Sequence, residues 1–216
     1  MKTLNIREEK ARILGKFPNL NGSNISRSLL RSEVLLGADS NIKFDILDPK
    51  SGAWRSEIRL LQNDSFVVSR MALLLLKRTD AVVTNAANYI TPLYSYLNKG
   101  IFSTSNDANV QAIYTNGVLS CEIAKVKYIP ALPCLLFENV PRSQNSTTGG
   151  ATVTSSRDSR IGEATGFIDV DQFIIKGTDT IDFKIDLPVS IDMSGGNTYA
   201  VLLIDGFLAS NRSLVK

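Results

Sequence analysis

The chain has 216 residues and a formal net charge of +3, because 24 Lys and Arg residues outnumber 21 Asp and Glu residues. This length suits one domain with a substantial hydrophobic core, and so small a net charge does not predict a polyanion as partner. The sequence contains no histidine. That absence excludes Ser-His-Asp and Cys-His catalysis and histidine-ligated zinc, so we expect a protein that is not an enzyme and needs no cofactor.

Positive charge is concentrated in residues 1–31. Seven basic residues stand against Glu8 and Glu9, so this segment carries +5 and the rest of the chain carries −2. The basic residues are Lys2, Arg7, Lys10, Arg12, Lys16, Arg27 and Arg31. A basic arm on a near-neutral body suits packaged nucleic acid or an anionic lipid surface, and the alternative is a solvated, partly helical extension.

A short helix is predicted near the start of this arm. Asn5 resembles an N-cap with Glu8 three positions later, and the helix can continue to Gly15. A helix of only about ten residues is marginal alone and needs a surface to lie on. Pro18 and Gly22 then break it. We therefore divide the chain into a basic N-terminal arm over 1–31 and a β-domain over 32–216.

Targeting and cysteine signals are weak. No apolar stretch of a signal peptide follows Met1, and the apolar run at 71–76 is far shorter than the ~20 residues that span a bilayer. We therefore expect synthesis in a cytoplasm without export. Cys121 and Cys134 both lie in apolar runs, which favours buried free thiols over a disulfide or a metal site.

The first half of the chain predicts strands. Residues 42–46 alternate between apolar and polar with period two, and 54–61 reads as the next strand. The long apolar run at 65–77 has the length of a helix, but Phe66, Val67 and Val68 favour a strand buried on both faces. A long, weakly patterned connection follows at 79–109.

The dipeptide Asn116-Gly117 is a strong signal for a two-residue type I′ turn. It predicts a hairpin between strands at 112–115 and 118–129, with a third strand at 135–137 after Pro133.

The connection at 142–166 is rich in Ser, Thr and Gly and has no aromatic residue. A connection this long is usually a functional surface loop or a mobile insertion, and Arg142, Arg157 and Arg160 are its candidate contacts with a neighbour.

Three more strands follow that connection, at 167–175, 181–187 and 199–208. Asp205-Gly206 interrupts the last of them, and the short flanking runs favour a β-bulge over a hairpin. Nine or ten short strands separated by turn signals predict an all-β fold. We expect an antiparallel β-sandwich of jelly-roll type with a short helix in its N-terminal arm.

Two other groups of residues suggest chemistry. The aromatic residues of the long connection could stack sugars or bases, or could instead pin the connection to the sandwich; they are Tyr89, Tyr94, Tyr96 and Phe102. In a ligand-binding module, Tyr89, Tyr94 and Tyr96 would form a platform together with Trp54. Five aspartates could hold calcium or act as a glycosidase pair, although positions on strand faces and in turns also explain them; they are Asp169, Asp171, Asp179, Asp182 and Asp186.

Three segments resemble the jelly-roll capsid proteins of tailless, membrane-containing bacteriophages of Bacteroidetes-type hosts. They are AIYTNGVL at 112–119, VPRSQ at 140–144 and DGFLASN at 205–211. The resemblance extends over residues 55–211 and implies a subunit of an icosahedral shell without cofactor or catalytic residues. Members of that group often carry two jelly rolls, so a chain of 216 residues favours a single jelly roll or a minor shell protein.

The expected function is therefore a self-assembling capsid subunit, located in the virion after synthesis in the host cytoplasm. Its partners would be copies of itself and other shell proteins, with membrane lipid or packaged nucleic acid at the arm, and no small-molecule substrate. The alternative is a non-catalytic ligand-binding or adhesin-like sandwich.

Overall fold

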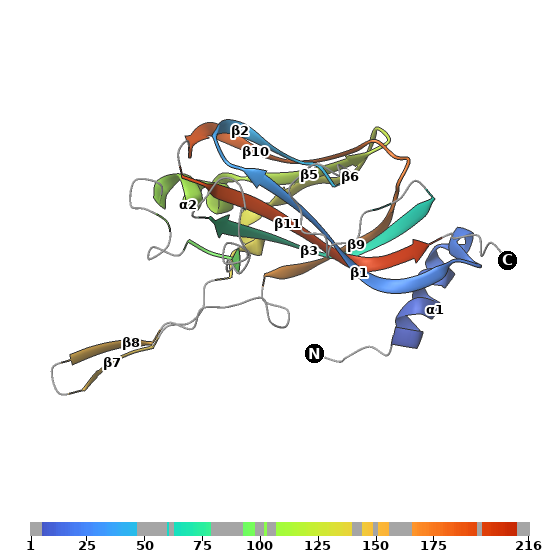
Figure 1. Ribbon diagram of the computed structural model, residues 1–216, viewed down its shortest axis with the longest axis horizontal. Helices are drawn as coiled ribbons and strands as arrows, with labels where there is room; N and C mark the ends of the chain where they lie inside the picture. Colours follow the sequence, from blue (N-terminus) through green and yellow to red (C-terminus); the bar gives the residue numbers. More distant parts are fainter. Residues whose placement is uncertain are drawn as a thin grey trace.

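The computed structural model of the protein describes residues 6–46, 60, 63–78, 93–97, 102, 107–139, 144–148, 151–155, 166–193 and 196–210. Over these residues the chain is mostly strand, and two antiparallel sheets pack face to face (Figure 1). The all-β sandwich predicted from the sequence is therefore confirmed.

The two sheets divide the strands between them. In sheet A, β3 pairs with β11 on one side and with β9 and β4 on the other, and β11 also pairs with β1. Its strands are β1 (Asn24–Leu35), β3 (Asp64–Lys77), β4 (Leu93–Tyr94), β9 (Phe167–Lys176) and β11 (Thr198–Ser210). Sheet B has the order β2, β10, β5, β6. Its strands are β2 (Ala38–Phe44), β5 (Val118–Ile123), β6 (Val126–Pro133) and β10 (Ile181–Asp192).

The strand pairings are nested. The outermost pair is β1 with β11, followed inward by β2 with β10, β3 with β9, and β5 with β6. The chain thus forms one long antiparallel ribbon, closed at its inner end by the β5–β6 hairpin. Two further pairings, β11 with β3 and β10 with β5, join successive turns of this ribbon into the two sheets.

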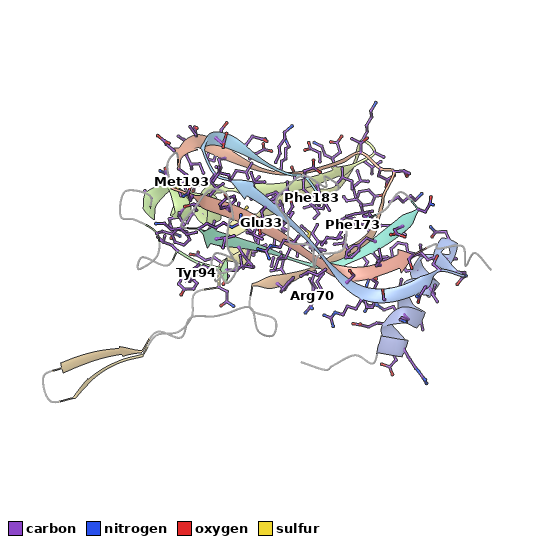
Figure 2. The ribbon with its side chains drawn as sticks, viewed as in Figure 1. Glu33, Arg70, Tyr94, Phe173, Phe183 and Met193 are labelled. Carbon is purple, nitrogen blue, oxygen red and sulfur yellow. The ribbon has the colours of Figure 1, made fainter. Side chains whose placement is uncertain are left out.

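The main core lies between the sheets, and its residues come from the inward positions of alternating strands. On β5 the inward residues are Leu119, Cys121 and Ile123, and they are buried together with Phe183 of β10, which Figure 2 shows between the two sheets. Cys121 and Cys134 are buried free thiols, as predicted. Burial raises the pKa of each thiol to about 12 because the core disfavours the thiolate.

The N-terminal helix is confirmed, but the boundary of the arm is wrong. Helix α1 (Ile6–Lys16) and the 3-10 turn η1 (Pro18–Leu20) are followed directly by β1 at Asn24. Arg27 and Arg31 therefore belong to sheet A. Their charges made this part of the chain resemble an arm, but both side chains pair with carboxylates of the sheet.

The hairpin predicted at Asn116-Gly117 is wrong. Residues 107–116 form helix α2 (Asp107–Asn116), whose buried face carries Val110, Ile113 and Tyr114 at helical spacing. Gly117 ends it by donating its N–H to the carbonyl of Ile113, and neither residue of the dipeptide has a positive φ. A β-carbon on Gly117 would lie 2.3 Å from the Ile113 carbonyl oxygen, so glycine is required here for close approach.

The type I′ geometry occurs eight residues later instead. Ala124 and Lys125 have φ values of 48° and 68° and connect β5 to β6. The single strand expected over 118–129 is therefore a hairpin. The strand expected at 135–137 is also wrong, since these residues belong to the 3-10 turn η3 (Cys134–Phe137).

Three further predictions, for the segments 142–166, 205–206 and 54–61, have different outcomes. The connection at 142–166 contains a separate hairpin, β7 (Gln144–Thr148) with β8 (Ala151–Ser155), which projects away from the sandwich in Figure 1. The bulge is confirmed by a shift of register between Asp205 and Gly206, and Ser69 of β3 is the extra residue opposite. Of the strand expected at 54–61, only buried Leu60 lies within the described residues.

Candidate functional site

The face of sheet A that points away from sheet B carries two apolar clusters, both buried. The first, which we call the central cluster, contains Ala72, Leu74, Leu76, Leu93, Tyr199, Val201 and Leu203. In the second, Ile13 and Leu20 from the N-terminal segment pack on Ile25, Val67, Phe207 and Ala209. Helix α1 therefore lies on the body of the protein, and Ile13 is the fully buried residue among its described side chains.

A charged band crosses this face between the two clusters. Asp205 of β11 accepts hydrogen bonds from Arg27 of β1, with 2.9 Å between Nη2 and Oδ2, and from Arg70 of β3, with 2.9 Å between Nε and Oδ2. The hydrogen bond to Asp205 raises the pKa of Arg27. The guanidinium of Arg70 also lies 5.3 Å from the ring centre of Phe167. The band therefore joins three neighbouring strands by paired charges.

A second charge cluster lies beside the central cluster, where β3 ends at Lys77. Glu33 of β1 forms ion pairs with Arg31 and with Arg78, and the side chains of Glu33 and Arg78 are only 5% and 6% exposed. The Arg78 guanidinium lies 4.6 Å from the ring centre of Tyr199. These contacts connect the edge strand β1 to the residue that follows β3. Such deeply buried charges require their partners, which indicates a structural role.

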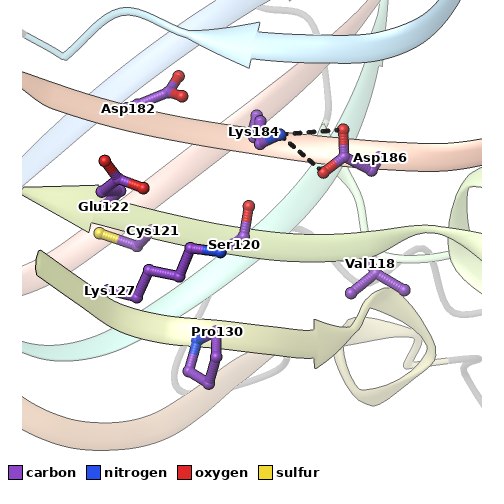
Figure 3. Close-up of a pocket in the computed structure, with 9 residues that line it drawn as sticks. All are labelled: Val118, Ser120, Cys121, Glu122, Lys127, Pro130, Asp182, Lys184 and Asp186. Atoms are coloured by element: carbon purple, nitrogen blue, oxygen red, sulfur yellow. Dashed lines mark hydrogen bonds and ion pairs between the residues drawn. The ribbon is translucent and has the colours of Figure 1, made fainter. Parts of the chain in front are cut away.

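The face of sheet B that points away from sheet A is polar and holds a pocket of about 210 Å³. Figure 3 shows Asp182, Lys184 and Asp186 of β10 beside Ser120 and Glu122 of β5. The ammonium of Lys184 lies 3.0 Å from the Asp186 carboxylate, and this partner raises the pKa of Lys184. Opposite charges are thus already paired within the pocket.

A second pocket, which we call the aromatic groove, lies between the N-terminal segment, β9 and β6. It has a volume of about 340 Å³. Its lining residues are Phe17, Asn19, Tyr128, Asp171, Gln172, Phe173, Ile174 and Lys176. Tyr128 stacks on Phe173 with 5.1 Å between ring centres and an angle of 29° between the ring planes. Sequence reasoning missed this groove, because its aromatic residues come from segments that are far apart in the sequence.

The structure disperses the basic residues predicted to act together. Arg7, Lys10, Arg12 and Lys16 lie on α1, whereas Arg27 and Arg31 pair with carboxylates on sheet A. Lys16 also has a local partner, since its ammonium donates to the backbone carbonyl of Gln172 at 3.0 Å. The remaining candidates, Lys2, Arg142, Arg157 and Arg160, lie outside the described residues.

The aromatic platform is not formed by its two described members. Tyr94 and Tyr96 are buried in the main core, with 6.1 Å between their ring centres, and Phe102 packs on Tyr94 at 6.0 Å. The hydroxyl of Tyr114 donates toward the backbone carbonyls of Leu73 and Tyr94. These contacts favour the alternative that the aromatics pin the connection to the sandwich. Trp54 and Tyr89 lie outside the described residues.

The five aspartates are also separated. Asp182 and Asp186 lie in the sheet B pocket, whereas Asp169 and Asp171 are on β9 of sheet A and Asp179 accepts a turn hydrogen bond from the backbone of Lys176. Across the described ranges, no three Asp, Glu or Cys side chains come together as a possible metal site.

Within the part of the chain that the structure covers, no helix has the length and apolar character needed to cross a membrane. Comparison with protein-family models, with curated proteins and with solved structures finds no match to this chain.

Proposed function

We propose that this chain is a self-assembling structural subunit of a bacteriophage capsid and that its sandwich is a jelly roll. The observation that carries the proposal is the nesting of the four strand pairs, from β1 with β11 to β5 with β6. A ribbon of eight antiparallel strands wrapped into two sheets is the arrangement of jelly rolls, which occur in viral capsids, lectins and cupins.

Two observations favour a viral capsid protein over a lectin or a cupin. The chain has no histidine with which to build a metal site of the imidazole type. Tyr94 and Tyr96, the described members of the aromatic platform, are buried in the core instead of facing a ligand. The lectin-like alternative therefore loses the two of its four aromatic residues that lie within the described part of the chain.

The projecting hairpin supports a role in assembly. β7 and β8 pair with each other and, in the described part of the chain, with no other strand. A two-stranded hairpin alone is marginally stable in water, and each of its outer edges presents unpaired backbone groups. A neighbouring subunit would supply the missing contacts, as expected for a symmetric shell.

The proposed location is the virion, and the proposed partners are copies of this chain and other shell proteins. Arg12 and Lys16 are exposed on α1, where membrane lipid or packaged nucleic acid could meet them. Exposed charges of this kind are screened by salt, so any such attachment should weaken as ionic strength rises.

The test is the size of the purified full-length protein as a function of concentration. We expect rings or shells in electron micrographs and a mass in light scattering many times that of a 23.6 kDa chain. A protein that keeps the mass of one chain at millimolar concentration, in both low and high salt, contradicts the proposal. A glycan array on the same sample then tests the binding-module alternative.

A further inference from the structure

The chain contains two Asn-Gly dipeptides, Asn21-Gly22 and Asn116-Gly117. Asparagine is one of the chemically labile residues of proteins, and it is modified when the main-chain nitrogen of the next residue attacks its side-chain amide. A glycine in that next position has no side chain to hinder the attack. The two dipeptides therefore start from similar reactivity, and the fold decides how they differ.

The first dipeptide lies in an open turn between η1 and β1. Asn21 and Gly22 are both exposed, and apart from the chain neighbours no atom lies within 4 Å of the place that a β-carbon on Gly22 would take. The N–H of Asn21 donates to the Pro18 carbonyl at 3.1 Å, whereas the N–H of Gly22 donates to no acceptor among the described residues. The nitrogen that must attack is thus at the surface and not held by a hydrogen bond.

The second dipeptide is held by the core. Gly117 is buried, its N–H donates to the Ile113 carbonyl at 3.2 Å, and its carbonyl accepts from the N–H of Cys134 at 2.9 Å. A β-carbon on Gly117 would lie 3.0 Å from Cγ2 of Ile185, so the glycine has little space in which to move. Attack on the Asn116 side chain therefore requires that the end of α2 first open.

Reaction at either site needs a rotation about the Cα–C bond of the asparagine, which turns the attacking nitrogen toward the side chain. Asn21 has a ψ of 131°, and rotation there moves an exposed turn whose nearest hydrogen bond runs from the N–H of Ser23 to the Leu20 carbonyl. Rotation at Asn116 instead pulls Gly117 out of its packed position. Opening an exposed turn costs less free energy than opening a packed helix end.

We propose that Asn21 is a site of spontaneous deamidation in the folded protein and that the fold protects Asn116. Hydroxide removes the N–H proton of Gly22, and the nitrogen then forms a bond to Cγ of Asn21. The bond from Cγ to Nδ2 breaks, and the leaving nitrogen takes a proton from water and departs as ammonia, which regenerates the hydroxide. Water then opens the cyclic imide. Breaking the bond from nitrogen to Cγ gives aspartate, and breaking the bond from nitrogen to the main-chain carbon gives isoaspartate.

The modified residue carries a new negative charge at a joint of the fold. Leu20 before it and Ile25 after it both belong to the apolar cluster that attaches the N-terminal segment to sheet A. Isoaspartate lengthens the main chain between these two residues by one carbon atom, so it changes the connection that this cluster must close. The inference is independent of the proposed function, because the reaction needs only this chain and water.

The test compares the two sites in one sample. The full-length protein is incubated at pH 8.5 in water labelled with heavy oxygen, and the peptides that contain Asn21 and Asn116 are followed by mass spectrometry. In the folded protein we expect Asn21 to react at least about tenfold faster, because Asn116 must first lose a hydrogen bond and the packing of Gly117. In urea that unfolds the chain, the two rates should agree within about threefold, because the fold no longer distinguishes the sites.

Asn21→Ser is the matched control, since it changes an exposed side chain and leaves no amide to lose. Its N-terminal peptide should take up no label, and its Asn116 should react at the wild-type rate. Equal rates at the two sites of the folded wild type overturn the proposal. A difference that persists unchanged in urea also overturns it, because the difference would then come from the neighbouring residues. Label found in aspartate without any isoaspartate contradicts the cyclic step, since direct hydrolysis of the amide gives aspartate alone.

Discussion

The two sheets differ in what lies on their outward faces. On sheet A the outward residues Leu74, Val201 and Leu203 are as buried as the residues of the main core. On sheet B the outward residues Ser120, Lys184 and their neighbours form a polar surface with a shallow pocket. Sheet A therefore has apolar clusters on both faces, with paired charges between those on the outward face, whereas sheet B is a boundary between the core and water.

This difference also separates the ion pairs into two kinds. The side chains of Glu33 and Arg78 on sheet A are almost completely buried, whereas the Lys184–Asp186 pair on sheet B is partly exposed to water. Charges in an apolar layer contribute to stability only while both partners are present, whereas exposed pairs contribute little. Removing one partner of an ion pair is thus expected to cost more stability on sheet A than on sheet B.

The largest effect should come from a charge placed in the outward apolar face of sheet A. Val201→Asp buries a carboxylate at a fully buried position, and we expect it to remove at least about 4 kcal/mol of stability or to prevent folding. The matched control is Val189→Asp at the 74% exposed position on β10, expected to change stability by less than about 0.5 kcal/mol. Urea unfolding measures both, and equal effects would refute the distinction between the sheets.

The second prediction compares the two kinds of ion pair. Glu33→Gln removes the carboxylate shared by Arg31 and Arg78, and we expect a loss of about 3 kcal/mol because the guanidinium groups stay buried. Asp186→Asn removes the partner of Lys184 on sheet B and should cost less than about 1 kcal/mol. Thermal melting of both variants decides the matter, since a small effect of Glu33→Gln would mean that water reaches the sheet A cluster.

The third prediction concerns the helix that covers one end of sheet A. Ile13→Ala removes the fully buried side chain by which α1 packs on Val67 and Phe207, with an expected loss of about 2–3 kcal/mol. Arg12→Ala changes the exposed neighbour and should leave stability within about 0.5 kcal/mol. If instead both variants unfold at the same denaturant concentration as the wild type, the packing of α1 on sheet A does not stabilise the protein.

The fourth prediction is a pH dependence that comes from the two buried thiols, Cys121 on β5 and Cys134 on η3. Burial raises the pKa of each thiol to about 12 in the folded protein, from its ordinary value of 9.0 in the unfolded chain. Above pH 9 the unfolded chain therefore binds fewer protons than the folded chain, so stability falls as pH rises toward 12, by about 1.4 kcal/mol per pH unit for each thiol. Replacing Cys121 and Cys134 by Ala should flatten this slope in unfolding measurements at pH 8.5 and 10. An unchanged slope would assign it to other groups.

Sequence reasoning succeeded where one strand faces both core and water. Residues 42–46 and 181–187 alternate with period two because they lie in sheet B, and both strands were predicted. The continuous apolar runs of β3 and β11 were also identified as strands buried on both faces. The common reason is that the pattern of apolar and polar residues along a strand follows from which of its faces are buried.

It failed where a local signal competed with packing. Asn116-Gly117 favours a turn, but burial of Val110, Ile113 and Tyr114 on one helix face outweighs that preference. The real turn at Ala124-Lys125 uses residues that do not favour a positive φ, so no local signal marks it. The aromatic groove joins Phe17, Tyr128 and Phe173 from three distant segments, and only the tertiary fold brings them together.

The position of β11 has a consequence for how the protein is made. This strand lies between β1 and β3 in sheet A, yet it is synthesised after both of them. Asn24 of β1 reaches its neighbour Ser210 across 186 residues, and at a synthesis rate of about 5–20 residues per second β1 waits many seconds for its partner. During that interval β1 and β3 lack the strand that joins them, so the five-stranded sheet can form only after β11 has been synthesised.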